Sequence, residues 1–194
     1  INLFFKILMK NLFAIFFLIS LSMNSQILDV INPKKNIGIK NWNIVNDDVM
    51  GGISTSMMSL NREKNLLFNG NLSLENNGGF ASSRLSLGKN ILNGVKFFKI
   101  KFKGDGNTYK LRFIQNNRRA SYSHDFKSAK DEWIELNLRV EDFKATWRGY
   151  SYSDYPALEP EEVISMGLQI SDKQEGEFIL EIEYIKAVFL KINP

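Results

Sequence analysis

The fold is decided by the stretch FFKIKFKGDGNTYKLRF, which runs from Phe97 to Phe113. Over residues 98–103, large apolar residues alternate with lysines, so the apolar side chains point to one face of an extended chain. Residues 104–107 form a turn signal, and the alternation resumes over 109–113. The pattern predicts two half-buried strands joined as a hairpin.

Similar alternation in other short segments predicts further strands, which lie at residues 66–74, 133–138, 164–170 and 178–188. A helix is favoured only at Pro160–Ile164, where a proline precedes two carboxylates, and it would span one or two turns. Short strands separated by turn signals, without long amphipathic helices, predict an all-β fold. We expect an antiparallel β-sandwich or jelly roll.

Composition limits the classes of protein to consider. A chain of 194 residues with 44% hydrophobic residues suffices for one well-buried domain. It contains no cysteine, which excludes disulfides, thiolate nucleophiles, cysteine-ligated zinc and iron–sulfur clusters. Without Lys6 and Lys10 of the N-terminal segment, the net charge falls from +4 to +2. The remaining basic residues are scattered among carboxylates, which argues against a nucleic-acid partner.

The N-terminal segment has the order of a secretory signal peptide. Lys10 precedes an apolar run over residues 12–21, and small residues follow, with Ser20 and Ser22 fitting a cleavage site. The run is shorter than the roughly 20 apolar residues that span a bilayer, so cleavage is favoured over a membrane anchor. The sequence therefore predicts a secreted or periplasmic protein. Its parts would be a signal peptide over 1–25, a lead-in over 26–40 and one domain over 41–190.

Two glycine-bearing blocks stand out from the strand pattern: WNIVNDDVMGGIS at residues 42–54 and ENNGGFASSR at 75–84. In each, amides and carboxylates that favour turns precede a Gly-Gly pair, and the chain then resumes as strand. The pairs Gly51-Gly52 and Gly78-Gly79 could form anion-binding nests of backbone N–H groups or could allow tight corners. We favour the structural interpretation.

These blocks, together with the GDG turn, resemble the signature of the complex I intermediate-associated protein 30 (CIA30) family over residues 41–188. The main matching positions are Trp42, Asn46, Asp47, Met50, Gly51, Gly52, Asn76, Asn77, Gly78, Gly79, Phe80, Arg84, Gly104, Asp105 and Gly106. The resemblance implies a galactose-binding-like β-sandwich similar to carbohydrate-binding modules. In eukaryotic relatives it implies a mitochondrial, chaperone-like factor that helps assemble respiratory complex I. The leader of this chain lacks the arginine-rich amphipathic pattern of a transit peptide.

The sequence offers little support for a catalytic site or a metal site. His124 is the only histidine; no nucleophile-elbow pattern surrounds it, and one histidine excludes a multi-histidine metal site. Aspartates in turn segments could in principle pair for glycoside hydrolysis or hold calcium, but they fit turn residues better. These aspartates are Asp47, Asp48, Asp105, Asp125, Asp154 and Asp172. We therefore predict no catalytic residue, no metal site and no cofactor.

A loop rich in aromatic residues is the best candidate for ligand binding. It contains Trp147, Arg148, Tyr150, Tyr152 and Tyr155. Exposed rings could stack on sugar faces or contact an apolar partner, and arginine adds a planar set of hydrogen-bond donors. Alternatively, the rings cap an open end of the sandwich.

Arg84 also has two interpretations. It could form an ion pair with Asp47 or Asp48 and so tie the two blocks together, or it could meet an anionic ligand. We favour the ion pair.

The leading functional hypothesis is a non-catalytic binding or assembly module with a protein partner. The alternative is an extracytoplasmic carbohydrate-binding module, and a hydrolase that uses loop carboxylates comes third. The sequence predicts neither nucleic-acid binding nor a membrane anchor after cleavage of the leader.

Overall fold

A computed structural model describes residues 24–147 and 149–191. These residues form thirteen β-strands and five short 3-10 turns. The strands are β1 (Asn24–Ile31), β2 (Trp42–Ile44), β3 (Thr55–Leu60), β4 (Leu66–Leu72), β5 (Ala81–Ser86), β6 (Phe97–Gly104), β7 (Thr108–Gln115), β8 (Ser121–Lys127), β9 (Trp133–Arg139), β10 (Lys144–Trp147), β11 (Tyr150–Tyr152), β12 (Val163–Ile170) and β13 (Gly176–Lys191). The 3-10 turns are η1 (Pro33–Lys35), η2 (Asp47–Met50), η3 (Glu75–Asn77), η4 (Val140–Asp142) and η5 (Pro160–Glu162).

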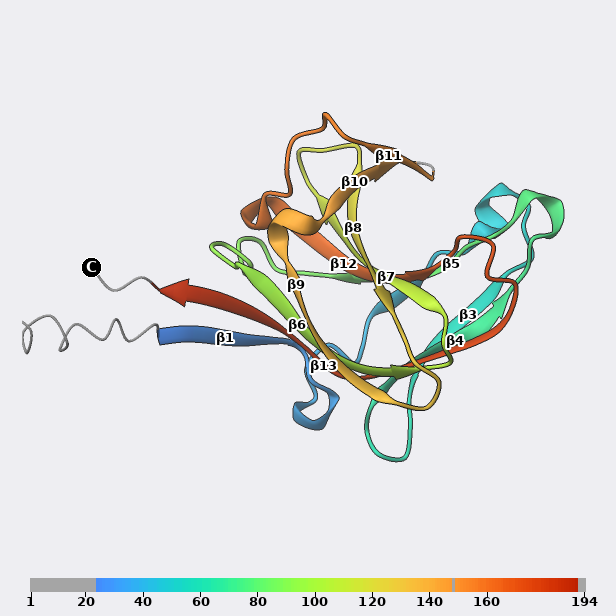
Figure 1. Cartoon of the computed structure of the whole chain (residues 1–194), viewed down its shortest axis with the longest axis horizontal. Helices are drawn as coiled ribbons and strands as arrows, with labels where there is room; N and C mark the ends of the chain where they lie inside the picture. Colours follow the sequence, from blue (N-terminus) through green and yellow to red (C-terminus); the bar gives the residue numbers. More distant parts are fainter. Residues whose placement is uncertain (1–23, 148, 192–194) are drawn as a thin grey trace, which may run out of the picture.

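The strands form two antiparallel sheets (Figure 1). One has six strands, in the order β3-β4-β13-β6-β9, with β1 paired to the far part of β13. The other has seven strands, in the order β11-β10-β8-β7-β12-β5-β2. The predicted all-β antiparallel sandwich is therefore confirmed.

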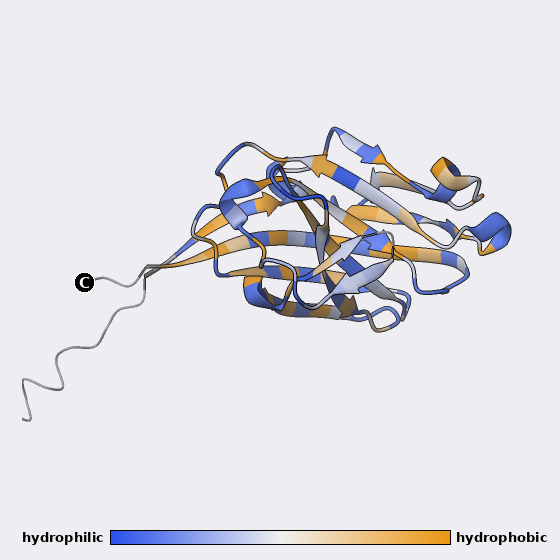
Figure 2. Cartoon of the chain, turned by 90° about the horizontal axis from the view of Figure 1, so that it is seen from above, coloured by the Kyte–Doolittle hydropathy of each residue, from blue (hydrophilic) through white to orange (hydrophobic). Residues whose placement is uncertain are grey.

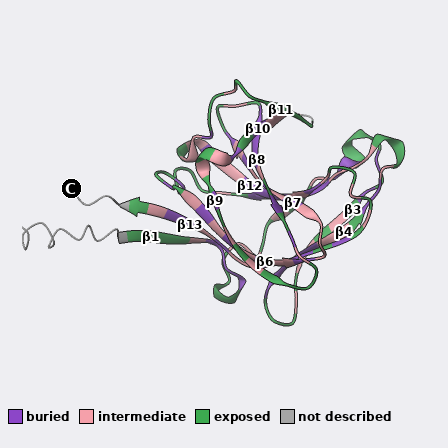
Figure 3. Cartoon of the chain, viewed as in Figure 1, coloured by how far each residue is buried: buried purple, intermediate pink, exposed green. Residues whose placement is uncertain are grey.

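Aromatic side chains fill the space between the sheets. Phe98 of β6 meets Phe113 of β7 with ring centroids 4.6 Å apart, and Phe102 of β6 meets Phe126 of β8 at 4.8 Å. Along β6 and β7 every second residue is buried, as the alternation predicts. Figure 2 shows this alternation of hydropathy along the strands, and Figure 3 shows the buried positions concentrated along the strands.

The predicted hairpin at residues 97–113 is wrong. β6 lies between β13 and β9 in one sheet, whereas β7 lies between β8 and β12 in the other. The GDG turn thus carries the chain from one layer to the other. Asp105 holds this crossover in place, because its carboxylate accepts hydrogen bonds from the Asn107 and Ile179 backbone N–H groups and from the Tyr109 hydroxyl, each at 2.9 Å. The apolar faces of the two strands pack against each other and do not lie side by side.

The other predicted strands are confirmed. They correspond to β4, β9, β12 and β13, and strands β3 and β5 follow the two Gly-Gly pairs as expected. The helical candidate at 160–164 is only the 3-10 turn η5, after which β12 begins at Val163.

The predicted signal peptide lies mostly in residues 1–23, outside the described residues. β1 begins at Asn24, inside the segment assigned to the leader, and pairs with β13 up to Lys191. Residues 26–31 are therefore part of the six-stranded sheet and are more than a lead-in. In the described part of the chain, no helix has the length and hydropathy needed to cross a membrane.

Candidate functional site

The two glycine-bearing blocks meet at the buried carboxylate of Asp47, which is 1% exposed. One oxygen accepts the Ser54 N–H at 2.9 Å, and the other accepts the Gly79 N–H at 2.7 Å, the Phe80 N–H at 3.3 Å and the Ser54 hydroxyl. Burial by itself raises the pKa of the Asp47 carboxyl. The hydrogen bonds from Ser54, Gly79 and Phe80 outweigh burial, so this pKa lies below its usual value. Asp47 is therefore a structural link between the blocks.

The glycines of both pairs make this contact possible. A Cβ on Gly52 would lie 2.4 Å from the Asp47 carboxyl carbon, and a Cβ on Gly78 would lie 2.7 Å from Oδ2. Gly51 and Gly79 adopt positive φ angles of 93° and 130°. The N–H groups of both Gly-Gly pairs are engaged within the chain: that of Gly79 donates to the Asp47 carboxylate, and those of Gly51, Gly52 and Gly78 donate to backbone carbonyl oxygens.

The favoured ion pair between Arg84 and Asp47 or Asp48 is not formed, so this hypothesis is wrong. Asp47 is enclosed by N–H and O–H donors, and in the described residues Arg84 makes no ion pair with either aspartate. Arg84 lies on β5, paired with Gly167 of β12 and Asn43 of β2. Alternation along β5 directs it to the outer face of the sheet, away from Asp47.

Several other family-signature residues stabilise the local backbone, whereas Met50 is exposed to solvent. Asn46 accepts hydrogen bonds from the Ser56 hydroxyl at 2.7 Å and the Ser82 N–H at 3.2 Å, and Trp42 donates to the Gly38 carbonyl at 2.9 Å. Asn76 and Asn77 adopt left-handed turn conformations. In contrast, Met50 is 70% exposed at the end of η2, where packing does not require it.

The aromatic loop is split between surface and core. Tyr150 and Tyr152 are 73% and 45% exposed on the edge strand β11. Tyr155 packs against the core, with its ring 6.0 Å from Tyr152 and 6.3 Å from the buried Tyr122. Trp147 is half-buried and its ring lies 4.6 Å below the Arg119 guanidinium. Arg148 lies outside the described residues.

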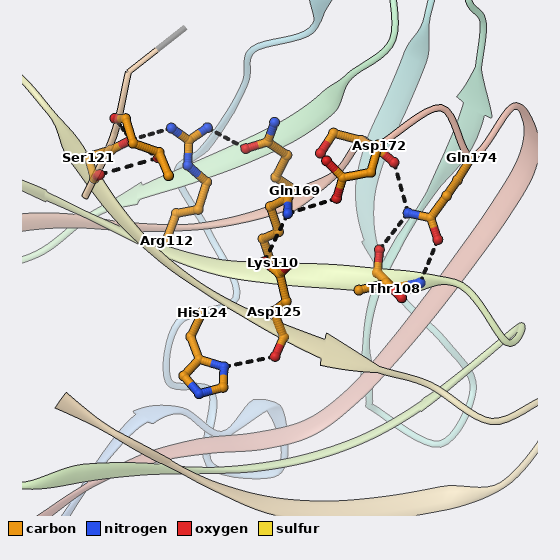
Figure 4. A network of polar contacts seen from close by, with 11 residues as sticks. Thr108, Lys110, Arg112, Ser121, His124, Asp125, Gln169, Asp172 and Gln174 are labelled. Carbon is orange, nitrogen blue, oxygen red and sulfur yellow. Dashed lines mark hydrogen bonds and ion pairs between the residues drawn. The ribbon is translucent and has the colours of Figure 1, made fainter. Parts of the chain in front are cut away.

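A network of polar side chains covers the outer face of the seven-stranded sheet (Figure 4). We call this outer face the polar face and define it by the network residues Lys110, Arg112, Ser121 and Gln169 together with Arg84 of β5, which shares the face with them. Arg112 of β7 donates to Gln169 of β12 and to Ser121 of β8. Lys110, two residues earlier, forms ion pairs with Asp125 and Asp172, both at 2.8 Å. Except for Arg84, the sequence interpretation did not select these residues, although they occupy the polar positions of the same alternation that predicted the strands.

Among the described residues, the histidine and several of the candidate aspartates make structural contacts. His124 Nδ1 lies 2.8 Å from the Asp125 carbonyl oxygen, and its ring packs edge-on against Phe143. Asp105 stabilises the crossover turn, while Asp125 and Asp172 are engaged by Lys110. Within residues 24–147 and 149–191, no three histidine, aspartate or glutamate side chains gather as a metal site.

A pocket of about 500 Å³ lies beside the end of β5, away from these groups. Its lining includes Val30, residues 38–41, residues 85–88 and Ile91, and Lys40 is the only charged residue among all its lining residues. It contains none of the candidate ligand residues, so we do not include it in the site.

Solved structures with similar folds include carbohydrate-binding modules. The family 11 module of the cellulosomal cellulase Lic26A-Cel5E of Clostridium thermocellum matches with a TM-score of 0.63 and 12% identity, over 89% of this chain and 98% of that one. The family 11 module from the same organism in complex with a β-1,3-1,4-mixed-linked tetrasaccharide matches at 0.60 and 12%, over 87% and 97%. A family 29 carbohydrate-binding module matches at 0.53 and 8%, over 85% and 86%. These likenesses confirm the β-sandwich fold.

Sequence comparison identifies the family. No curated protein matches the chain. The family described as Complex I intermediate-associated protein 30 (CIA30) matches residues 31–182, which is most of the chain and includes both glycine-bearing blocks. The chain therefore belongs to the CIA30 family.

Proposed function

We propose that this chain is a non-catalytic carbohydrate-binding module that acts outside the cytoplasm. The observation that carries the proposal is the polar face. In the described part of the chain, no further sheet covers the outer side of this sheet (Figure 1), and its middle strands present an array of hydrogen-bond donors and acceptors there. Such an array suits the hydroxyl groups of a sugar chain, which need several hydrogen bonds at once.

Exposed rings lie at the edge of the same sheet. Tyr150 and Tyr152 lie on the edge strand β11, where they pair with Trp147 and Ala145 of β10. Their rings therefore project from the opposite side of the sheet to Ser121 and Thr146 and offer a second contact surface. Tyrosine combines a flat apolar surface for a sugar ring with a hydroxyl for hydrogen bonding. The similarity to a module solved with a bound tetrasaccharide supports the proposal through the fold alone.

We expect Tyr150→Ala and Tyr152→Ala each to weaken polysaccharide binding by about two- to tenfold, since each removes one stacking surface. The measurement is affinity electrophoresis or calorimetry against a panel of soluble polysaccharides. Trp133→Ala is the matched control, because this 39% exposed ring lies on the other sheet. Absence of binding to every glycan tested would argue against the proposal, and equal losses in all three variants would remove the tyrosines from the site.

A second candidate function is protein assembly, as in the name of the family. It is favoured by the signature tip, which we define as Val49, Met50 and Ile53. These apolar side chains are 69%, 70% and 50% exposed on and just after η2, although Asp47 at the start of the same turn is buried. Exposed apolar residues gathered at one place are typical of contacts with another protein.

For this candidate we expect Met50→Ser to abolish co-purification of a defined protein partner while leaving thermal stability unchanged. The exposed Met57→Ser on β3 is the control, because it removes the same side chain outside the signature tip. A partner retained equally by both variants would exclude the tip as the docking surface.

A further inference from the structure

Two arginines lie on either side of a glycine on the polar face. Gly167 of β12 is paired in register with Arg84 of β5 on one side and with Arg112 of β7 on the other. A Cβ built on Gly167 would lie 3.5 Å from Arg84 Cγ, so the Arg84 stem runs alongside the glycine. Because Gly167 carries no side chain, nothing on β12 separates the two arginines at this point.

The two positive charges affect each other. Burial and the neighbouring charge of Arg84 together lower the pKa of Arg112 to about 10. In the described part of the chain neither arginine forms an ion pair with a carboxylate. Arg112 donates only to the neutral oxygens of Gln169 and Ser121.

On the outer face of the six-stranded sheet, by contrast, three lysines have carboxylate partners. There Lys99, Lys101 and Lys103 form ion pairs with Glu135, Glu183 and Glu181 at 3.0, 2.7 and 2.9 Å. On the polar face itself, Lys110 forms ion pairs with the carboxylates of Asp125 and Asp172. Among the described residues the arginine pair therefore has no carboxylate partner, whereas Lys99, Lys101, Lys103 and Lys110 each have one.

The chemistry of this arginine pair suits an oxyanion ligand. Two like charges held close together, one of them largely desolvated, are unfavourable until an opposite charge binds. Guanidinium groups offer planar forks that match a carboxylate or a sulfate ester. Lys110, two residues before Arg112, is engaged by Asp125 and Asp172, so it does not extend the positive charge of the arginine pair in the way that a nucleic-acid backbone requires.

We propose that Arg84 and Arg112 bind the acidic group of an anionic glycan, while Gln169, Ser121 and Thr146 face its neutral hydroxyls. The inference rests on the proposed carbohydrate-binding function and specifies its ligand class. Ser121 suits this role because its hydroxyl also contacts Thr146, which extends the hydrogen-bonding row toward β11. The acidic group is a carboxylate in a uronic acid or a sulfate ester in a sulfated sugar.

The test is calorimetric titration of the full chain with three oligosaccharides: an oligouronate, its carboxyl-reduced neutral counterpart, and a sulfated oligosaccharide. We expect an acidic form to bind at least about tenfold more tightly than the neutral form. Whether the uronate or the sulfated sugar binds more tightly identifies the group. We expect Arg84→Gln and Arg112→Lys each to raise the Kd for it by about ten- to a hundredfold, since the first removes both the charge and the forked donor and the second keeps the charge but removes the fork.

Arg62→Gln is the control, because it removes the same charge from an exposed turn between β3 and β4. Thermal denaturation of each variant checks its fold. Arg84→Gln should melt like the parent, because Arg84 forms no ion pair with any of residues 24–147 and 149–191. Equal affinity for neutral and acidic sugars would overturn the inference and leave the carbohydrate-binding proposal standing. Losses of equal size in Arg62→Gln, or tighter binding of a phosphopeptide than of any acidic sugar, would also overturn it. Failure to bind any glycan would reject both.

Discussion

Replacing Asp47 with alanine is expected to lower the free energy of unfolding by about 3–5 kcal/mol. The variant leaves the buried N–H groups of Ser54, Gly79 and Phe80 without their common acceptor, and it opens a space against Gly52 and Gly78. Urea denaturation of both proteins measures the difference. Asp48→Ala is the matched control, because Asp48 is the exposed neighbour in the same 3-10 turn, and we expect it to change stability by less than about 0.5 kcal/mol.

The same carboxylate predicts how stability depends on pH. The folded-state pKa of Asp47 lies below its unfolded-state value of about 3.9, so its contribution is fully present above that value. It is lost as the pH falls through the folded-state pKa, when the carboxyl gains a proton and can no longer accept all its hydrogen bonds. Asp47→Asn should therefore lose less stability than the parent between pH 5 and about pH 2. Identical acid dependence in the two proteins would show that Asp47 is not the group responsible.

Phe98→Ala is expected to destabilise the protein by about 3–5 kcal/mol, because it leaves a cavity at the centre of the contact between the sheets. Phe98 is 1% exposed, and its ring lies 4.6 Å from Phe113 and 5.9 Å from Phe143. Phe97→Ala is the control, since it removes the same ring from the next position on the same strand. Phe97 is only half-buried, so we expect a clearly smaller loss.

Thermal or urea unfolding, with unchanged circular dichroism of the native state, decides the comparison. Equal losses from the two substitutions would mean that β6 does not present alternate faces to core and solvent. The whole assignment of the two layers would then need revision.

The sequence predicted the fold class because alternation at period two is a local property of an extended chain. The predicted segments at 66–74, 133–138, 164–170 and 178–188 all became strands. Shorter or more polar strands, such as β2, β10 and β11, were missed. They have too few residues for a period to be recognised, and pairing with their neighbours makes them strands.

For the candidate site, residue type alone predicted only some of the exposed binding residues. The aromatic loop was selected because it concentrates rings, but Tyr155 packs against the core while Tyr150 and Tyr152 remain exposed. Arg112 and Gln169 were overlooked because, taken singly, they look like ordinary polar residues on the outside of a strand. Their proximity depends on the register between β7 and β12, which no single segment contains.

What the sequence by itself determined is the family signature, the antiparallel β architecture and the alternating faces of the strands, since these depend on neighbouring residues. What only the tertiary structure decided is which distant residues meet. It sends β6 and β7 into opposite sheets, because two matching apolar faces can be buried against each other as well as side by side. It directs Asp47 to backbone N–H groups of the second glycine-bearing block, and it places Arg84 and Arg112 on one face without a carboxylate partner in the described part of the chain.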